Sequence, residues 1–319
     1  MALGHEVIGE IISVGSDVKN FKSGDKVLVS AVTPDWSTIP AQAGFSQHSG
    51  GMCRGFSFTK VKHGVFAEKF HVNDADSNLA HIPGFSKISG GKWSEILTEK
   101  EKKELAAFTM CGDMMTTGFY GAELADIEFG DRVCVIGIGP VGLMAIAACA
   151  IRGAAEIFAV GSREICQKVA LEYGATHIIN YKDTPKYEDK VMELTNKEGV
   201  DKVILAGADK DMDILTRAIT MIRPGGIIAN VAMIGLDFVK PLTINPIFFA
   251  NGLGDIQIRG GMCPGGRRRL ERMARLIMTG RVDVSQIVTH IYDGFEKIEE
   301  AFKIMCEKPE GLIKPVVIC

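Results

Sequence analysis

The alternation of hydrophobic and polar positions changes character near residue 130. Before that point, short β-branched segments at 7–14 and 27–29 are interrupted by Gly and Asp, which is typical of strands in a small antiparallel barrel or sandwich. An irregular stretch over 34–64 follows, and strand character returns at 64–72. The first part of the chain is therefore predicted to be a β-rich domain with one long loop, of the kind that often lines a functional site.

After residue 130, short apolar runs alternate regularly with helical segments. The runs are DRVCVIG, AEIFAVG, HIIN, DKVILAG and GIIANVA, and the helical segments are 140–152, 163–173, 186–197 and 211–222. Strands that are apolar along their whole length are buried on both faces, as in a parallel sheet covered by helices. We therefore predict an α/β fold with a doubly wound parallel sheet, beside a second, smaller β-rich domain.

Two charged segments outside these patterns are interpreted as helices without chemistry. Residues 84–110 are rich in Lys and Glu, with apolar positions near helical spacing, and predict a solvated surface helix. A basic cluster lies on an expected helix near 266–279, where Arg267, Arg268, Arg269, Arg272 and Arg275 fall. Few aromatic residues accompany it, so a solvated or subunit-contacting face is a better interpretation than a nucleic-acid site.

Composition restricts the class of protein. The 319 residues are 46% hydrophobic and 24% charged, which excludes a disordered chain and suggests about two domains. The net charge of −3 provides no general attraction to nucleic acid or anionic membranes, and we expect neither as a partner. No apolar run approaches the ~18–20 residues that span a bilayer, and the start of the chain lacks signal-peptide features. The eight cysteines form no C-x-x-C pair, so we predict reduced thiols and a cytoplasmic protein.

A glycine-rich turn carries the clearest chemical signal. Gly137, Gly139 and Gly142 form a G-x-G-x-x-G motif, with Pro140 and Val141 between the second and third glycines. The motif follows an apolar strand and opens a helix, which is the context that makes it physically meaningful. The glycines permit the tight turn and the close approach of a pyrophosphate, which the helix N-terminus can bind. We predict a dinucleotide site here.

The end of the next strand indicates which dinucleotide binds. NAD sites place an Asp or Glu about 20 residues past the motif, on the ribose 2′-hydroxyl. Here the strand ends in Gly161, Ser162 and Arg163, without a carboxylate. Gly161 removes a side chain where a 2′-phosphate would lie, and Ser162 and Arg163 can donate hydrogen bonds to it. The sequence therefore predicts NADP(H), with Tyr181 near the same pocket.

A candidate metal site lies near the start of the chain. His5 and Glu6 precede a β-branched segment, where they can offer one metal ligand and a nearby carboxylate. Asp113, just before the dinucleotide domain, is a second candidate ligand or equally a helix N-cap.

Taken together, these motifs resemble the zinc-dependent medium-chain alcohol dehydrogenases, in the microbial NADP-dependent secondary-alcohol branch. The resemblance runs along nearly the whole chain. Its motifs are LGHE, GDKV, TPDW, HSGG, HVNDAD, DMMTTG, GIGPVGLM and CPGGR. It implies a GroES-like catalytic domain over 1–115, an NADP-binding Rossmann domain over 116–256, and a segment over 257–319 that partly returns to the catalytic domain.

The same resemblance implies the activity and its residues. His5 and Asp113 correspond to zinc ligands, and Glu6 to a carboxylate that can enter the zinc sphere, so His5, Glu6 and Asp113 are the expected catalytic and metal residues. The substrate pocket would include Trp36, Met233, Met262 and Cys263. The implied reaction is the reversible, zinc-assisted oxidation of a small secondary alcohol to a ketone with NADP, in a homotetramer.

One departure from the family keeps two alternatives open. The family's first zinc ligand is a Cys that precedes the GHE motif, beside a hydroxyl residue that begins the proton relay. This chain begins shortly before His5, so we expect that segment and the opening strands to be absent, as in a fragment, a mis-set start or a decayed paralogue. Cys53 is a conceivable substitute ligand. A non-catalytic NADP(H)-binding paralogue and a zinc-free quinone or enone reductase are the alternatives.

Overall fold

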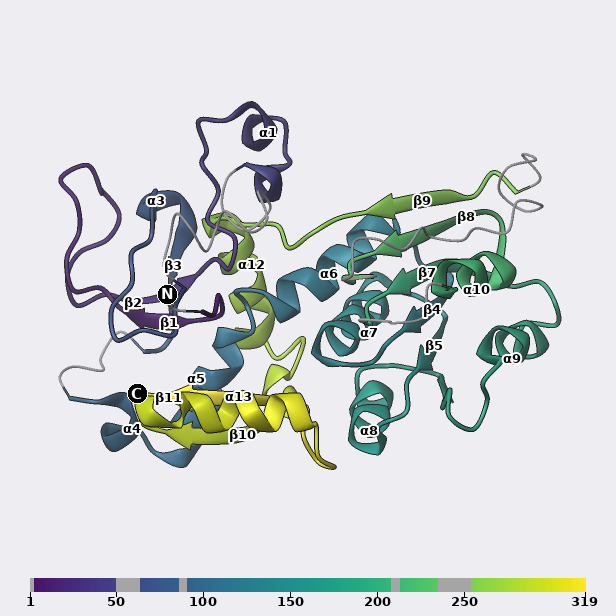
Figure 1. The fold of residues 1–319 in the computed structure, drawn as a ribbon. Helices are drawn as coiled ribbons and strands as arrows, with labels where there is room; N and C mark the ends of the chain where they lie inside the picture. The colour runs from purple at the N-terminus through teal and green to yellow at the C-terminus, as the bar shows by residue number, and fades with distance from the viewer. Residues whose placement is uncertain (1–2, 50–63, 86–90, 208–212, 235–253) are drawn as a thin grey trace. The chain divides into compact units, whose positions relative to one another are not determined.

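The computed structural model describes residues 3–49, 64–85, 91–207, 213–234 and 254–319. The chain folds into two compact units (Figure 1). Unit 1 consists of Met1–Thr116 and Cys263–Cys319, and unit 2 of Thr117–Met262. The sequence predicts boundaries at 115 and 256, and the residues between 256 and 262 include the last strand of the unit 2 sheet.

Unit 2 contains the doubly wound sheet that the sequence predicts. Six strands, among the described residues, lie in the order β6-β5-β4-β7-β8-β9, and each neighbouring pair is parallel. They are β4 (Arg132–Ile136), β5 (Glu156–Val160), β6 (His177–Ile179), β7 (Val200–Leu205), β8 (Ile222–Asn230) and β9 (Gln257–Gly260). The sequence order reverses between β4 and β7, and ligands of open α/β sheets bind at the carboxyl ends of the strands beside such a point.

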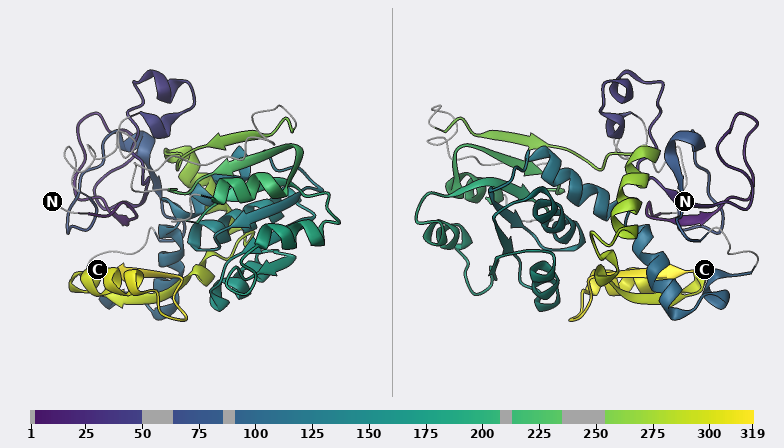
Figure 2. Two further views of the ribbon diagram at one scale, coloured as in Figure 1. Left: turned by 45° about the vertical axis from the view of Figure 1, so that its right-hand side comes forward. Right: turned by 180° about the vertical axis from the view of Figure 1, so that it is seen from behind.

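Helices cover both faces of this sheet, as Figure 2 shows. They are α6 (Met114–Leu124), α7 (Pro140–Arg152), α8 (Glu164–Glu172), α9 (Tyr187–Leu194) and α10 (Ile214–Met221). Alternate side chains of β4 point to opposite faces, so Cys134 and Ile136 join one core cluster with residues of α9 and α10. Val133 and Val135, which alternate with them along the strand, are also fully buried. Burial on both faces explains the uninterrupted apolar runs in the sequence.

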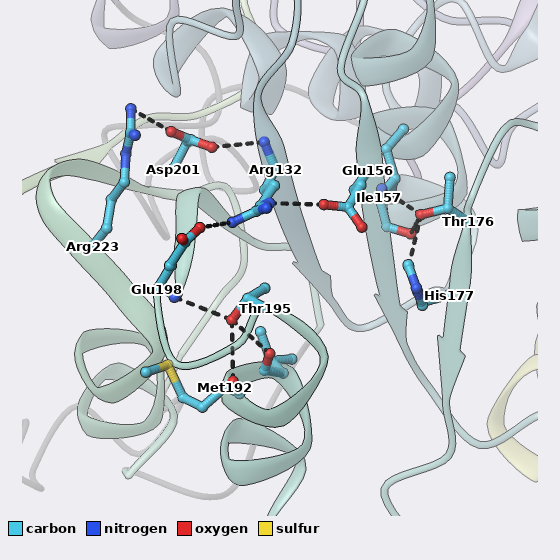
Figure 3. A network of polar contacts seen from close by, with 12 residues as sticks. Arg132, Glu156, Ile157, Thr176, His177, Met192, Thr195, Glu198, Asp201 and Arg223 are labelled. Carbon is cyan, nitrogen blue, oxygen red and sulfur yellow. Dashed lines mark hydrogen bonds and ion pairs between the residues drawn. The ribbon is translucent and has the colours of Figure 1, made fainter.

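A polar network joins the amino-terminal ends of four of these strands (Figure 3). The Arg132 guanidinium donates to Glu156 at 2.7 Å and to Glu198 at 2.5 Å. The Arg132 backbone N–H donates to Asp201 at 2.7 Å, and Asp201 also pairs with Arg223. The network lies at the edge opposite the carboxyl ends, where it fixes β4, β5, β7 and β8 to one another.

Unit 1 is built from short strands. Strands β1 (Ile8–Glu10), β2 (Lys26–Val29) and β3 (Leu79–His81) form an antiparallel sheet, while β10 (Val288–Asp293) and β11 (Lys314–Ile318) form a parallel pair. The strand expected over 64–72 is wrong, because these residues are irregular. Val65 and Phe66 donate backbone hydrogen bonds to Gly4 and Leu3, but no ladder of described residues continues from them.

The remaining elements of unit 1 are helical and mostly short. They are α1 (Ile39–Gln42), η1 (Ser46–His48), α3 (Ala75–Asn78), α4 (Trp93–Ile96), α5 (Glu99–Thr109), α12 (Arg267–Met278), η3 (Val284–Ile287), η4 (Phe295–Lys297) and α13 (Ile298–Glu307). The interpretation of 84–110 as a solvated helix needs correction, because the second half of α5 is buried. Even Lys102 is only 4% exposed, and its ammonium group pairs with Asp293 at 2.7 Å.

The basic helix α12 is partly structural. Arg269 donates to the Thr116 carbonyl at 2.9 Å, and Arg267 pairs with Glu271 and stacks over Phe21. Two of the five arginines are therefore used within unit 1 itself. Among all the helices that the structure describes, none has the length and apolar character to cross a membrane.

Candidate functional site

Three candidate metal ligands meet in unit 1. His5 and Glu6 come just before β1, and Asp113 lies immediately before α6. Their ligand atoms all lie within 4.8 Å of one another, and His5 Nε2 is 2.8 Å from Asp113 Oδ2. The fold thus brings together residues that are 108 positions apart in the sequence.

The pairing with Asp113 governs the charge of His5. The hydrogen bond to the Asp113 carboxylate raises the pKa of His5 above its usual value, and this effect outweighs the opposing effect of burial. The His5 side chain is 36% exposed and, with Glu6, lines a cavity of about 1920 Å³ within unit 1. An ion from solvent can therefore reach the imidazole, which binds metals in its neutral form.

Glu6 has one paired and one unpaired oxygen. Oε2 accepts a hydrogen bond from the Lys314 ammonium group, at the start of β11. Oε1 is buried and has no hydrogen-bond partner among the described residues. A buried polar atom without a partner is costly, and a cation bound at Oε1 would offset that cost.

These observations fit a divalent metal ion. One imidazole nitrogen and carboxylate oxygens are ligands that zinc takes in proteins, and a bound cation would pair the Glu6 oxygen that has no described partner. Cys53, the other conceivable ligand, lies outside the described residues. The assignment of His5, Glu6 and Asp113 to zinc remains a prediction from the sequence that this geometry supports.

Two glycines of the predicted cofactor turn in unit 2 lie tightly against neighbouring backbone. Gly137 has φ +89°, and a Cβ there would lie 2.3 Å from the backbone of Gly207. A Cβ on Gly142 would lie 1.9 Å from the Gly137 carbonyl oxygen. Gly139 differs, because among the described residues a Cβ there would meet only the Arg163 guanidinium, at 3.8 Å. Gly137 and Gly142 thus allow the turn to form, and Gly139 leaves its surface open.

The N-terminus of α7 is suited to an anion. The helix begins at Pro140, its N-cap is Gly139, and no side chain caps it. Backbone N–H groups at the start of a helix, beginning here with Val141 and Gly142, bind phosphate together with the helix dipole. The open face at Gly139 therefore fits a dinucleotide pyrophosphate.

The residues predicted to select NADP lie beside this helix start. Ser162 donates to the Tyr181 hydroxyl at 3.0 Å, and Arg163 lies near Gly139. Both Ser162 and Arg163 are partly exposed at the carboxyl end of β5. Gly161 also has a packing role: a Cβ there would lie 2.1 Å from the Ile138 side chain. Gly161 is therefore required for packing against the turn, whether or not it also leaves room for a phosphate.

The four predicted substrate-pocket residues are divided between the units. Trp36 and Cys263 belong to unit 1, where the Trp36 indole N–H donates to Asn78 at 3.2 Å and Cys263 is buried beside the Gly112 carbonyl. Met233, which is 65% exposed, and Met262 belong to unit 2. Their common role at a substrate therefore stays a prediction.

Sequence reasoning missed Lys314. It contacts a candidate metal ligand 308 positions earlier in the chain, and its neighbours Ile313 and Pro315 form no motif that would mark it. The only signal in the sequence was a charged residue at the start of an otherwise apolar strand.

Two known family models match the chain. The family model described as "Alcohol dehydrogenase GroES-like domain" matches residues 1–84, and that described as "Zinc-binding dehydrogenase" matches residues 140–279. The first match includes His5 and Glu6, and the second includes the glycine-rich turn from Pro140 onward.

Known relatives match this chain over its whole length. The chain is 51% identical to an NADP-dependent isopropanol dehydrogenase of Thermoanaerobacter brockii and 49% identical to one of Clostridium beijerinckii, covering 100% of this chain and 84% of each relative. Among solved structures, a zinc-dependent alcohol dehydrogenase 2 from Streptococcus pneumonia is 26% identical with a TM-score of 0.80, over 99% of this chain and 82% of that one. The chain therefore belongs to the zinc-binding alcohol dehydrogenase family, in the branch that contains these two isopropanol dehydrogenases.

Proposed function

We propose that this protein catalyses the reversible, NADP-dependent oxidation of a small secondary alcohol to a ketone. The observation that carries the proposal is the meeting of His5, Glu6 and Asp113 with their ligand atoms within 4.8 Å, in a chain about half identical to NADP-dependent isopropanol dehydrogenases. A secondary alcohol such as 2-propanol, and its ketone, are the substrates by which the proposal is best tested.

His5 and Asp113 would hold zinc, with Glu6 close enough to enter its sphere. When bound, zinc acts as a Lewis acid on the oxygen of the alcohol or ketone. The 2.8 Å contact places His5 Nε2 beside Asp113 Oδ2, so zinc would take the place of the proton that these two ligand atoms share. The raised pKa of His5 reflects the same carboxylate, which would favour a cation in place of the proton.

The turn from Gly137 to Gly142 and the residues Ser162, Arg163 and Tyr181 would hold NADP. When bound, the nicotinamide accepts or donates the hydride. The start of α7 would bind the pyrophosphate, and the Arg163 guanidinium, which lies beside Gly139, would neutralise the 2′-phosphate. Ser162 and Tyr181 are already joined by a hydrogen bond, so their hydroxyl groups are positioned as a pair.

The two alternative functions are less well supported. A zinc-free reductase or a non-catalytic cofactor-binding protein has no use for a buried carboxylate oxygen without a partner, such as Glu6 Oε1. The two isopropanol dehydrogenases that match along the whole chain belong to neither class.

The assembly and location are further parts of the proposal. We infer a homotetramer in the cytoplasm, as the resemblance implied. The free thiols of Cys111, Cys134 and Cys149 are buried among apolar residues, which fits a protein kept in a reducing compartment. Light scattering of the purified protein measures the assembly directly, and a mass of one or two chains would contradict the tetramer.

Turnover with defined metal and cofactor tests the activity. The zinc-loaded protein is expected to oxidise 2-propanol and reduce acetone, faster with NADP(H) than with NAD(H). Chelation should abolish turnover, and added zinc should restore it. Turnover that persists after the metal is removed would favour the zinc-free reductase, and the absence of turnover in zinc-loaded protein that binds NADPH would favour the non-catalytic binder.

A further inference from the structure

A glutamine of α8 is hydrogen-bonded to both ends of the segment that is predicted to select NADP. This segment, residues 161–163, connects β5 to α8. The Gln167 side chain donates from Nε2 to the Gly161 carbonyl at 2.9 Å, and the Gln167 backbone N–H donates to the Arg163 carbonyl at 3.0 Å. One half-buried residue therefore holds the segment at both ends, with Ser162 between them.

Only one of these two hydrogen bonds depends on the identity of the side chain. The bond to Arg163 is an ordinary helical bond between residues four apart, which any residue except proline can make. The bond to Gly161 reaches six positions back, beyond the start of the helix, and needs a donor at the end of a long side chain. The N-cap residue Arg163 makes no side-chain cap of its own. The Gln167 amide is therefore a specific feature of this turn.

The side-chain bond fixes a peptide group that the sheet leaves free. The Gly161 N–H donates to the Ile179 carbonyl of β6 at 3.0 Å, so the sheet holds Gly161 on its amino-terminal side. Its carbonyl belongs to the next peptide group, which is planar and includes the Ser162 N–H. By holding this carbonyl, Gln167 also sets the direction of the Ser162 N–H and of the chain that follows. The place of Ser162, whose hydroxyl donates to Tyr181, thus depends on the amide.

We propose that Gln167 is a positioning residue for the choice of NADP over NAD. The inference rests on the proposed cofactor site. Gln167 holds residues 161–163 in one shape, so that Ser162 and Arg163 can donate to the same 2′-phosphate. Donors that are already in place bind more tightly, because little conformational freedom is lost on binding. NADH has no 2′-phosphate, so its binding does not depend on this segment in the same way.

A simpler role for Gln167 would be a purely structural one. The loss of a half-buried hydrogen bond lowers stability wherever it occurs, and a loosened unit 2 would bind both cofactors less tightly. The two roles differ in whether the loss depends on the 2′-phosphate. NADPH and NADH differ by that group alone, so the ratio of their affinities separates the two roles.

The experiment measures the dissociation constants of NADPH and NADH by fluorescence titration of the intact protein. Gln167→Met keeps the length of the side chain and removes the donor. We expect it to weaken NADPH binding by about 3–10-fold, the scale of one hydrogen bond, and to leave NADH binding unchanged. Gln167→Asn keeps the amide but is one methylene too short, so it should lose the same preference. It gives the same test if Gln167→Met does not fold.

A second background shows whether Gln167 acts through its neighbours. In a protein that carries both Ser162→Ala and Arg163→Ala, the donors to be positioned are gone, so Gln167→Met should have no further effect on NADPH binding. An equal loss in this background and in the wild type would mean that the amide acts on the cofactor directly. That result would overturn the proposal, as would equal weakening of NADPH and NADH, or no weakening of either, by Gln167→Met.

A matched control comes from the opposite edge of the same sheet. The Thr195 hydroxyl also donates to a backbone carbonyl, that of Val191, at 2.9 Å (Figure 3). Thr195→Val removes this bond without a change of shape, so it should lower the melting temperature and leave the ratio of NADPH to NADH affinity as in the wild type. A wild type that binds NADH as tightly as NADPH would contradict the proposed cofactor itself. If the wild type prefers NADPH and Gln167→Met keeps that preference, only this inference fails.

Discussion

The two units build their sites in opposite ways. In unit 2, a turn a few residues long carries most of the predicted cofactor site, and backbone packing between Gly137, Gly142 and Gly207 decides the shape of that turn. In unit 1, side chains from distant segments form the candidate metal site: His5 contacts Asp113 over 108 positions, and Glu6 contacts Lys314 over 308. The turn is thus local and defined by the backbone, whereas the candidate metal site depends on contacts between distant parts of the unit.

Because the two sites use different residues, mutations should affect them separately. A change in unit 1 that removes one charged partner should alter metal binding and leave the glycine-rich turn intact. A change in the turn should alter cofactor binding or stability and leave the metal site intact. A single substitution that changes both metal binding and cofactor binding would contradict this separation of the two sites.

The largest effect is expected for Asp113→Ala. It removes a proposed zinc ligand and the partner that orients His5, so turnover should fall by about 10³-fold or more, since a metal Lewis acid contributes several kcal/mol to catalysis. NADPH affinity should not change. Steady-state kinetics and zinc analysis of the same sample check both points. Wild-type turnover in the Ala variant would exclude Asp113 from the site.

Cofactor selection should depend on Arg163. A hydrogen bond to a charged group contributes about 1.5–3 kcal/mol, so Arg163→Ala should weaken NADPH binding by about 10–100-fold and leave NADH binding nearly unchanged. Fluorescence titration of both cofactors measures the difference. Lys168 is the control, because it lies on the same helix and pairs with Glu164 at the surface. Equal losses for NADH and NADPH would contradict a role at the 2′-phosphate.

The turn itself can be tested by adding one methyl group. In Gly142→Ala the new Cβ would lie 1.9 Å from the Gly137 carbonyl oxygen, so the turn must shift, at a cost of about 1–3 kcal/mol. Thermal unfolding should show a lower melting temperature, with the zinc content unchanged. Gly260→Ala provides the comparison, because a Cβ on Gly260 in β9 meets nothing within 4 Å. Equal stability of the two variants would argue against close packing at Gly142.

The smallest effect concerns stability and its pH dependence. The hydrogen bonds from Lys102 to Asp293 and Glu99 raise the pKa of Lys102 above 10.5. A raised pKa in the folded state stabilises the protein below 10.5, and this contribution disappears as the pH rises through the folded-state pKa. Lys102→Met should therefore lower the urea midpoint by a constant amount near neutral pH, and the difference from the wild type should shrink above 10.5.

The control for Lys102 is its neighbour on α5. Lys103 is exposed, so Lys103→Met should leave the urea midpoint unchanged at every pH. A difference between Lys102→Met and the wild type that grows in alkaline solution would contradict the ion pair as its source.

Burial and strand pairing explain which features the sequence could predict. The strands of unit 2 are apolar along their length because both faces are buried, so β4 and its glycine-rich turn could be located from a few residues. The segment at 64–72 also has strand-like apolar positions, but among the described residues it forms no ladder beyond the two hydrogen bonds from Val65 and Phe66, and pairing is not visible in a local pattern. The burial of Lys102 is likewise invisible in a local pattern, because its ion-pair partner, Asp293, lies 191 positions later.

The candidate metal residues were identified from motifs rather than from physical principles. A His-Glu pair and a distant Asp carry no local sign that they meet, and only the resemblance to a family joined them. Lys314 was missed because no motif contains it. The packing role of Gly161 could not be predicted either, since its contact with Ile138 joins the end of one strand to the turn after another.

The central claim is that unit 1 holds the metal and unit 2 holds the cofactor, each with its own residues. Zinc per chain and NADPH affinity, measured on the same samples of wild type and His5→Ala, test it most directly. We expect about one zinc per chain in the wild type, little or none in His5→Ala, and equal NADPH affinity in both. Zinc retained in His5→Ala, or NADPH binding lost together with the metal, would contradict the account.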